Sequence, residues 1–201
     1  MTPDVVLEFW FGEPAHDEES YTRKARRWFM GGAGLDREIA ERFGALHAQA
    51  ARGGLDEWAQ TPRGRLALVI VLDQFTRNLH RGSAKAFAQD AKACQLALGA
   101  LDRGLDADLS LDERMFLQLP LGHSEDLELQ NRAVAYVERL AAEAPAALRG
   151  MWEINVSQAR AHRDTIARFA RFPQRNAALS RTTTGEEMEF LEEWKQKQPP
   201  V

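Results

Sequence analysis

Cysteine is almost absent from the chain: Cys94 is the single one among 201 residues. A lone cysteine excludes an intrachain disulfide and a metal site built from several cysteines. Long apolar runs are also missing, because the longest, Leu66 to Leu72, is far too short to cross a bilayer. The N-terminus has no basic stretch before its apolar residues, so we expect no secretory signal. These absences favour a soluble, cytoplasmic protein with no membrane partner.

The chain has no excess of basic residues. It holds 26 Lys and Arg against 30 Asp and Glu, a net charge of −4. Domains that bind nucleic acid usually carry a positive excess, so we expect no nucleic-acid partner. The chain has 201 residues, and 44% of them are hydrophobic. It is therefore long enough to form a stable core without disulfides or bound metals. No long linker divides it, so residues 1–201 are expected to form a single domain. The sequence does not indicate an oligomeric state.

Helix-forming residues dominate the composition, and few stretches alternate apolar and polar residues as exposed strands do. We therefore expect an all-α protein of about nine helices, stacked antiparallel in a tetratricopeptide-like way. The expected helices cover residues 3–10, 18–29, 36–52, 63–80, 84–102, 111–118, 125–142, 152–171 and 185–197. Residues 197–201 are expected to be a frayed tail.

Start and stop signals support these ranges. Thr61-Pro62 is typical of a helix start, and Gly53-Gly54 is typical of a helix end. Ser83 and Ser124 are expected to cap the helices that follow them. Before the last helix, Thr183 with Glu186 or Thr184 with Glu187 resembles a capping box. The apolar run at Leu66–Leu72 is the exception, since it could also be a buried strand. No second run exists to pair with it, which favours the helix.

A first polar cluster follows this apolar run. On a helix, Asp73, Arg77 and His80 share one face, and Asn78 and Arg81 lie on the adjacent stripe. Charged groups in such a position are paired or face a cleft, because an unpaired buried charge is costly. One interpretation is a structural Asp73–Arg77 ion pair. The other is a binding face that holds all five residues.

A second cluster, His123-Ser124-Glu125, precedes a helix whose N-terminus favours anions. His123 and Glu125 are the candidate catalytic residues, each able to act as a general acid or base beside a pocket, with Ser124 as a contact. The alternative is a helix cap with helpful charges.

A third cluster, from His162 to Arg181, is rich in arginine. One interpretation is that these arginines pair with the carboxylates of the acidic last helix. The other is that they bind a ligand with a carboxylate or phosphate group, which arginine holds through two parallel hydrogen bonds. The segment from Arg171 to Asn176 also echoes the first cluster, because both place Arg-Asn shortly after Phe. If the two segments are neighbours, two Arg-Asn pairs would line one cavity.

No metal or cofactor is expected. The five histidines are scattered, and no zinc-protease, Walker or dinucleotide-binding pattern is present.

Several motifs together resemble a bacterial family known only as domain of unknown function nine-two-four. The matching stretches are Phe9-Trp10-Phe11-Gly12, Arg27-Trp28-Phe29, Asp73-Gln74-Phe75-Thr76-Arg77-Asn78, Phe87-Ala88-Gln89-Asp90, His123-Ser124-Glu125 and Arg171-Phe172-Pro173-Gln174-Arg175-Asn176. Thr76 and Gln174 depart from the Pro and His of the family pattern. The resemblance implies a helical, tetratricopeptide-like fold in a bacterial protein and no established activity.

We therefore expect a pocket for a polar or anionic small ligand, with hydrolysis or group transfer as the chemistry if the protein is an enzyme. The sequence leaves open whether it is one. The expected ligand-binding residues are Asp73, Arg77, Asn78, His80, Arg81, Ser124, His162, Arg171, Arg175 and Asn176. The alternative is a non-catalytic module that binds peptides or proteins in a groove between helices.

Overall fold

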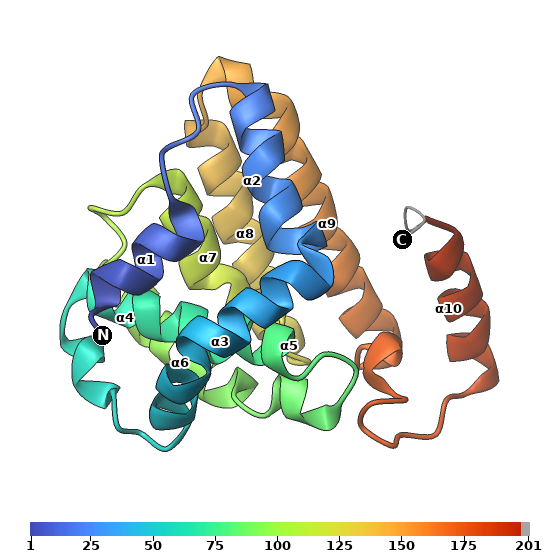
Figure 1. Ribbon diagram of the computed structural model, residues 1–201. Helices are drawn as coiled ribbons and strands as arrows, with labels where there is room; N and C mark the ends of the chain where they lie inside the picture. Colours follow the sequence, from blue (N-terminus) through green and yellow to red (C-terminus); the bar gives the residue numbers. More distant parts are fainter. Residues whose placement is uncertain (198–201) are drawn as a thin grey trace.

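The computed structural model describes residues 1–197, and their regular elements are all helices, with no strand among them (Figure 1). The α-helices are α1 (Pro3–Phe11), α2 (Glu18–Met30), α3 (Gly32–Ala51), α4 (Pro62–Val69), α5 (Thr76–Leu79), α6 (Asp90–Leu101), α7 (Leu111–Gly122), α8 (Leu127–Glu143), α9 (Arg149–Phe169) and α10 (Gly185–Lys197). Short 3-10 helices connect them: η1 (Asp56–Gln60), η3 (Ala84–Phe87), η4 (Ala146–Leu148) and η5 (Pro173–Arg175). The all-α prediction is confirmed.

The apolar run forms a helix at the centre of the molecule. Between α4 and α5 lies a π-helical segment, η2 (Ile70–Phe75), and the three elements run on without a break. Counted as one, this central helix makes nine helices in the described residues. Every residue from Leu66 to Phe75 is buried, so the strand alternative is wrong. The run is apolar on all sides because neighbours surround it on all sides.

Aromatic side chains join the N-terminal helices to this centre. The indole of Trp10 in α1 packs edge-on against Phe75 and Phe116, with ring centroids 5.6 Å apart in both pairs. Trp28 in α2 contacts Phe116 at 4.7 Å and donates a hydrogen bond of 2.8 Å from its indole N–H to the carbonyl of Trp10. Edge-to-face ring pairs of this kind stabilise a core beyond their buried area. They fix α1 and α2 on α7.

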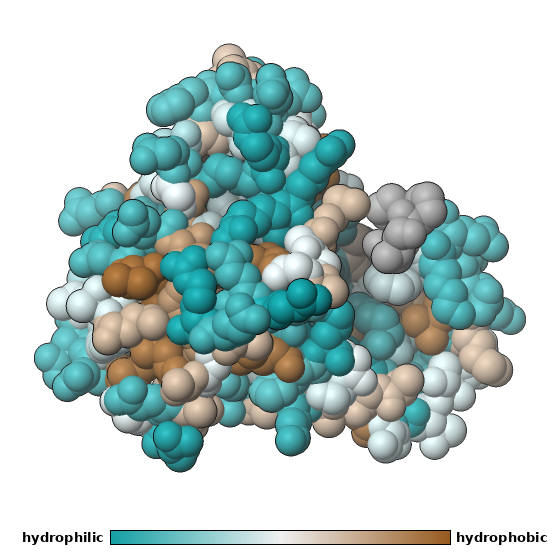
Figure 2. Space-filling model, in the orientation of Figure 1, coloured by the Kyte–Doolittle hydropathy of each residue, from teal (hydrophilic) through white to brown (hydrophobic). Residues whose placement is uncertain are grey.

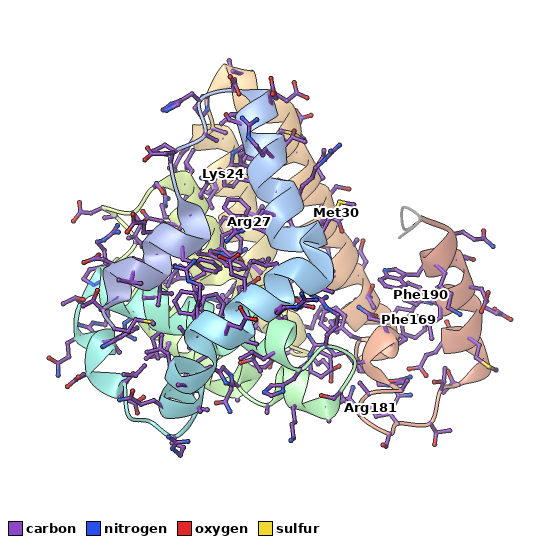
Figure 3. All side chains as sticks on the ribbon, viewed as in Figure 1. Lys24, Arg27, Met30, Phe169, Arg181 and Phe190 are labelled. Atoms are coloured by element: carbon purple, nitrogen blue, oxygen red, sulfur yellow. The ribbon has the colours of Figure 1, made fainter. Side chains whose placement is uncertain are left out.

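The C-terminal half is a stack of helices in which α8 packs against both α7 and α9. Helix α10 stands apart at the edge of the molecule (Figure 1). Phe190 of α10 reaches back to Phe169 of α9, and their ring centroids are 5.1 Å apart (Figure 3). In Figure 2 the surface is hollowed between α10 and the body. Together with the contacts of Arg168 to Glu186 and of Arg171 to Glu187, the Phe169–Phe190 pair attaches α10 through its first half.

Some predicted boundaries need correction. The stretch expected to be helical over 84–102 is a 3-10 turn followed by α6 from Asp90. Helix α3 begins at Gly32, earlier than the start expected at residue 36. Helix α7 runs past Pro120 to Gly122. Asp126, not Ser124, caps α8, because its carboxylate accepts hydrogen bonds from the backbone N–H groups of Glu128 and Leu129. The expected frayed tail lies outside the described residues apart from Lys197, which ends α10.

Two expected caps are present. The Thr61 hydroxyl accepts a hydrogen bond from the N–H of Gly64 at the start of α4. Thr184 and Glu187 form the capping box of α10, each side chain accepting from the other residue's N–H. Among residues 1–197 no helix is long and apolar enough to cross a membrane.

Candidate functional site

Asp73 is the centre of a buried polar cluster. It projects from η2, and its side chain is 1% exposed. Oδ1 lies 2.9 Å from Nη1 of Arg77 and 2.9 Å from Nδ1 of His123, while Oδ2 accepts a hydrogen bond of 2.6 Å from the amide of Gln74. A carboxylate buried this deeply needs such partners, because an unpaired charge would not stay ionised.

The side chain of Thr76 bonds to the backbone of the π segment that carries Asp73. The hydroxyl of Thr76 donates a hydrogen bond of 2.6 Å to the carbonyl of Leu72 and accepts one of 2.8 Å from Nε2–H of His47. Side chains that bond to the helix backbone satisfy groups that a regular α-helix would pair internally. Short π segments inside α-helices are frequent at functional sites.

Arg77 and Arg175 meet on one carboxylate. Asp90, the first residue of α6, lies 3.1 Å through Oδ2 from Nη2 of Arg77 and 3.3 Å through the same oxygen from Nη1 of Arg175. The two arginines come from α5 and η5, which lie far apart in the chain. The structure thus brings Arg77 of the first sequence cluster next to Arg175 of the third.

Aromatic rings hold the Arg175 guanidinium. Its carbon lies 4.7 Å from the ring centroid of Phe87 and 4.6 Å from that of Phe172. Nη2 donates a hydrogen bond of 2.8 Å to the carbonyl of His123. Arginine stacks well on aromatic faces because its charge is delocalised over a plane. Burial lowers the pKa of Arg175 from its ordinary value, yet the group remains charged.

The pKa values of the titratable groups in the cluster are shifted in different directions. Burial raises the pKa of Asp90, against the attraction of Arg77. Burial alone would also raise the pKa of Asp73, but Arg77 and His123 outweigh it and hold this pKa well below its usual range. The pKa of His123 is lowered by burial and by Arg77, although Asp73 opposes the shift. Groups whose pKa values are pushed apart in this way are typical of sites that move protons.

The Asp73 contact sets the protonation pattern of His123. Because the Asp73 carboxylate lies at Nδ1, the neutral ring carries its proton on Nδ1 and donates a hydrogen bond from there to Asp73. Nε2 is then a free acceptor, and it has no hydrogen-bond partner among the described residues. This is the pairing of an orienting carboxylate and a base that activates nucleophiles in many enzymes.

Glu125 is engaged elsewhere. Its carboxylate accepts two hydrogen bonds, of 2.8 and 2.9 Å, from Arg181 and a third of 2.9 Å from the N–H of Phe172. Burial would raise its pKa, but Arg181 and the Phe172 N–H lower it instead. Figure 3 shows Arg181 on the segment that leads to α10. Ser124 accepts a hydrogen bond from the N–H of Asp126. Glu125 therefore anchors the C-terminal segment.

Three residues of the first cluster point away from Asp73. Asn78 and Arg81 both donate to Asp36 of α3, with the shortest contact of each at 2.8 Å. His80 packs against His47, with ring centroids 5.6 Å apart. The regular helical face expected from the sequence is thus divided between two groups of partners.

Arg171 and Asn176 also bind a separate carboxylate, that of Glu187 in α10. Arg171 donates to it through Nε at 2.6 Å and Nη2 at 2.8 Å, and Asn176 donates at 3.2 Å. The two Arg-Asn pairs therefore do not line one cavity, because both asparagines face other partners. His162 lies against Phe172, with ring centroids 5.4 Å apart, and burial lowers its pKa.

Asp90 and its aromatic neighbour Phe87 belong to the cluster, although neither is among the residues expected from the sequence. Both belong to the Phe87-Ala88-Gln89-Asp90 stretch, which is the signal that could have found them. No group of three or more potential metal ligands gathers within residues 1–197. Two shallow depressions lie away from the cluster, one on α9 around Arg160 and one on α2 around Thr22.

Comparisons with known proteins agree with the sequence resemblance. The profile of a family described as "Bacterial protein of unknown function (DUF924)" matches residues 6–194. A solved structure of a protein of unknown function, ATU0120 from Agrobacterium tumefaciens, is similar at 36% sequence identity with a TM-score of 0.79. That similarity covers 95% of this chain and 97% of the other. No curated protein matches the chain. The chain belongs to the bacterial family of unknown function DUF924.

Proposed function

We propose that Arg77, Arg175 and His123 form a site for a small anionic molecule, at which His123 transfers a proton. The observation that carries the proposal is the contact of 2.9 Å between His123 Nδ1 and the buried Asp73, beside two arginines that converge on one carboxylate. His123 follows directly after α7, and its contact with Asp73 fixes the orientation of its ring. Such an arrangement is expected where a base must be held in place.

The chemistry follows from the state of the imidazole. Because its pKa is lowered, His123 is neutral near pH 7, with its Nδ1 proton bound to Asp73. Nε2 can then accept a proton from water or a substrate hydroxyl, and Asp73 stabilises the cation that forms. The arginines supply the positive charge that holds an anionic substrate. Hydrolysis or group transfer is the class of reaction that this set of residues supports.

The proposal assigns different roles to the residues expected from the sequence. Asp73, Arg77, Arg175 and His123 make the site, and His162 supports it by packing on Phe172. Glu125 is an anchor and not a catalytic residue, because all its described contacts are to Arg181 and the Phe172 backbone. The remaining expected residues contact α3 or α10, except Ser124, which accepts a hydrogen bond from the N–H of Asp126 before α8. Those that contact α3 or α10 are Asn78, His80, Arg81, Arg171 and Asn176.

A thermal-shift screen tests the proposal with acetate, malonate, inorganic phosphate and nucleotides. A ligand that binds the native state must raise the melting temperature. We expect at least one anion to do so in the natural protein and not in the Arg175→Met variant. Arg132→Met is the matched control, because Arg132 forms an exposed ion pair with Asp102 away from the cluster. The proposal fails if every anion acts equally on the two variants.

A second function has its own supporting observation. Between α10 and the body the surface is hollowed (Figure 2), and α10 leaves Met188 and Trp194 exposed. A tetratricopeptide-like stack could hold a peptide in such a groove. A protein that binds a peptide there should protect the amides of α10 from hydrogen exchange when the partner is added. A small ligand at Arg77 and Arg175 should protect the start of α6 instead.

A further inference from the structure

The arginine pair of the proposed site already holds a carboxylate, the side chain of Asp90. We propose that Asp90 is an internal substitute for the ligand and that the ligand group which displaces it is a carboxylate. This inference rests on the proposed function, since it concerns what the same two arginines bind. It also adds a regulatory element, because the site opens only when Asp90 leaves.

The two arginines hold Asp90 loosely compared with the ion pair of Arg171 and Glu187. The hydrogen bonds that Asp90 accepts from Arg77 and Arg175 are 3.1 and 3.3 Å long, and each arginine donates through only one of its nitrogens. Glu187 receives two nitrogens of Arg171, at 2.6 and 2.8 Å. Parallel, short bonds of that kind are the strong form of the arginine–carboxylate pair. The contacts of Asp90 have neither feature.

The carboxylate of Asp90 also lacks part of its hydrogen bonding. Oδ1 is buried and has no hydrogen-bond partner of good geometry, although Nη2 of Arg77 lies 3.0 Å away. A buried carboxylate oxygen without a hydrogen bond costs free energy. Burial correspondingly raises the pKa of Asp90. The native contacts therefore stabilise this carboxylate poorly, and an external one with freedom to orient could fit the two arginines better.

The charges of the cluster determine which charge of the ligand fits it. The positive charges of Arg77 and Arg175 are balanced by the negative charges of Asp73 and Asp90. The cluster as a whole is therefore uncharged as long as His123 is neutral. A monoanion that replaces Asp90 preserves this balance once Asp90 has turned to solvent. A phosphate dianion would leave an excess negative charge beside the buried Asp73, which is unfavourable at low dielectric. Charge balance thus favours a carboxylate.

The test compares Asp90→Asn with the natural protein, using acetate and inorganic phosphate as probes. Binding is followed by NMR through the Nε–H signals of Arg77 and Arg175. If the open site is populated below about 10%, removing the internal competitor should tighten acetate at least about tenfold. Phosphate should gain less. A general effect of the lost negative charge would instead favour the dianion, so a larger gain for phosphate overturns the inference.

Two further variants separate displacement from other causes. Asp90→Glu keeps the competing carboxylate and should not tighten acetate. Asp102→Asn removes the same charge from the other end of α6, where Asp102 pairs with Arg132, and should bind acetate as the natural protein does. If Asp90→Asn fails to fold, Asp90→Ser serves in its place, because serine suits a helix N-terminus.

The outcomes distinguish the inference from the function on which it rests. If acetate binds the natural protein and Asp90→Asn with equal affinity, Asp90 is no substitute and the anion site stands. If neither anion moves the signals of Arg77 and Arg175 in any variant, both proposals fail, and the pair with Asp90 is structural.

Discussion

Nδ1 of His123 lies 2.9 Å from Oδ1 of Asp73, although 50 positions separate the two residues. The contact joins the end of α7 to the π segment in the central helix. It satisfies a buried carboxylate and fixes the orientation of the imidazole at the same time. Stability and the proposed chemistry therefore depend on the same atom pair, and they can be separated only by measuring both.

Replacing Asp73 with Asn should lower the free energy of unfolding by about 3 kcal/mol, because a buried ion pair loses one member. Because Arg77 keeps its contact with Asp90, we expect a cost at the low end of what breaking a buried ion pair usually has. The pKa of His123 should fall further, since Asp73 raises it in the natural protein. Urea unfolding and an NMR titration of the imidazole measure the two effects. Asp102→Asn is the control, with an expected cost below about 1 kcal/mol for an exposed pair.

Stability should fall as the pH drops from about 7.5 towards 5.5, because three histidines with lowered pKa values have the usual unfolded value near 6.5. They are His47, His123 and His162, and burial is the main cause for each. The unfolded chain then binds more protons than the native one, so acid favours unfolding. Their contribution is complete above the unfolded pKa and is lost below it.

Urea unfolding at half-unit pH steps checks this dependence. His47→Gln should flatten the profile, and the same substitution at the exposed His16 should leave it unchanged. A profile that is flat over this interval in the natural protein would contradict the burial of these rings.

Glu187→Gln should release α10 without unfolding the rest. Glu187 accepts hydrogen bonds from Arg171, Asn176 and the N–H of Thr184, and the Arg171 bond is the main reason that its pKa is lowered to about 2. Loss of that charge should speed amide exchange in α10 at least about tenfold. Hydrogen-exchange mass spectrometry measures the rate. Glu193→Gln, on the exposed face of the same helix, should change nothing.

Ala170→Gly should stabilise the protein by up to about 1 kcal/mol. Ala170 caps α9 with φ 55°, a left-handed conformation that costs an L-residue free energy and glycine none. The same change at Ala144, which caps α8 in an extended conformation, should destabilise. Thermal unfolding of the two variants gives the comparison, and equal signs would exclude backbone strain as the cause.

Much of the fold could be predicted because its signals are local. Thr61-Pro62 begins a helix, and the Thr184–Glu187 box begins another, through contacts within three residues. The cap of α8 was mistaken because Ser124 and Asp126 both suit the position, and only the backbone path decides between them. The interruption before α6 was missed since its residues are good helix formers.

The site could be predicted only in part. The Asp73–Arg77 pair follows from helical spacing and is present. Asp90 was missed because its partners lie on α5 and η5, and no local pattern reports a pairing across 85 positions. For the same reason the sequence does not show that Arg175 pairs with Asp90 at the site while Arg171 pairs with Glu187 of α10. A carboxylate near each arginine was foreseeable, but the identity of the carboxylate was not.

In the π segment Ile70–Phe75 each backbone hydrogen bond spans five residues in place of four, so this turn holds one residue more than an α-helical turn. Removing one residue from it would restore regular α-helical spacing and leave the orientation of the helix on either side unchanged. Removing one from α4 would instead rotate everything after it by about 100°. Arg77 would then leave Asp90, and Asn78 would leave Asp36, while every side chain that makes these contacts is still present. The central helix should therefore accept a deletion in the π segment more readily than one in α4.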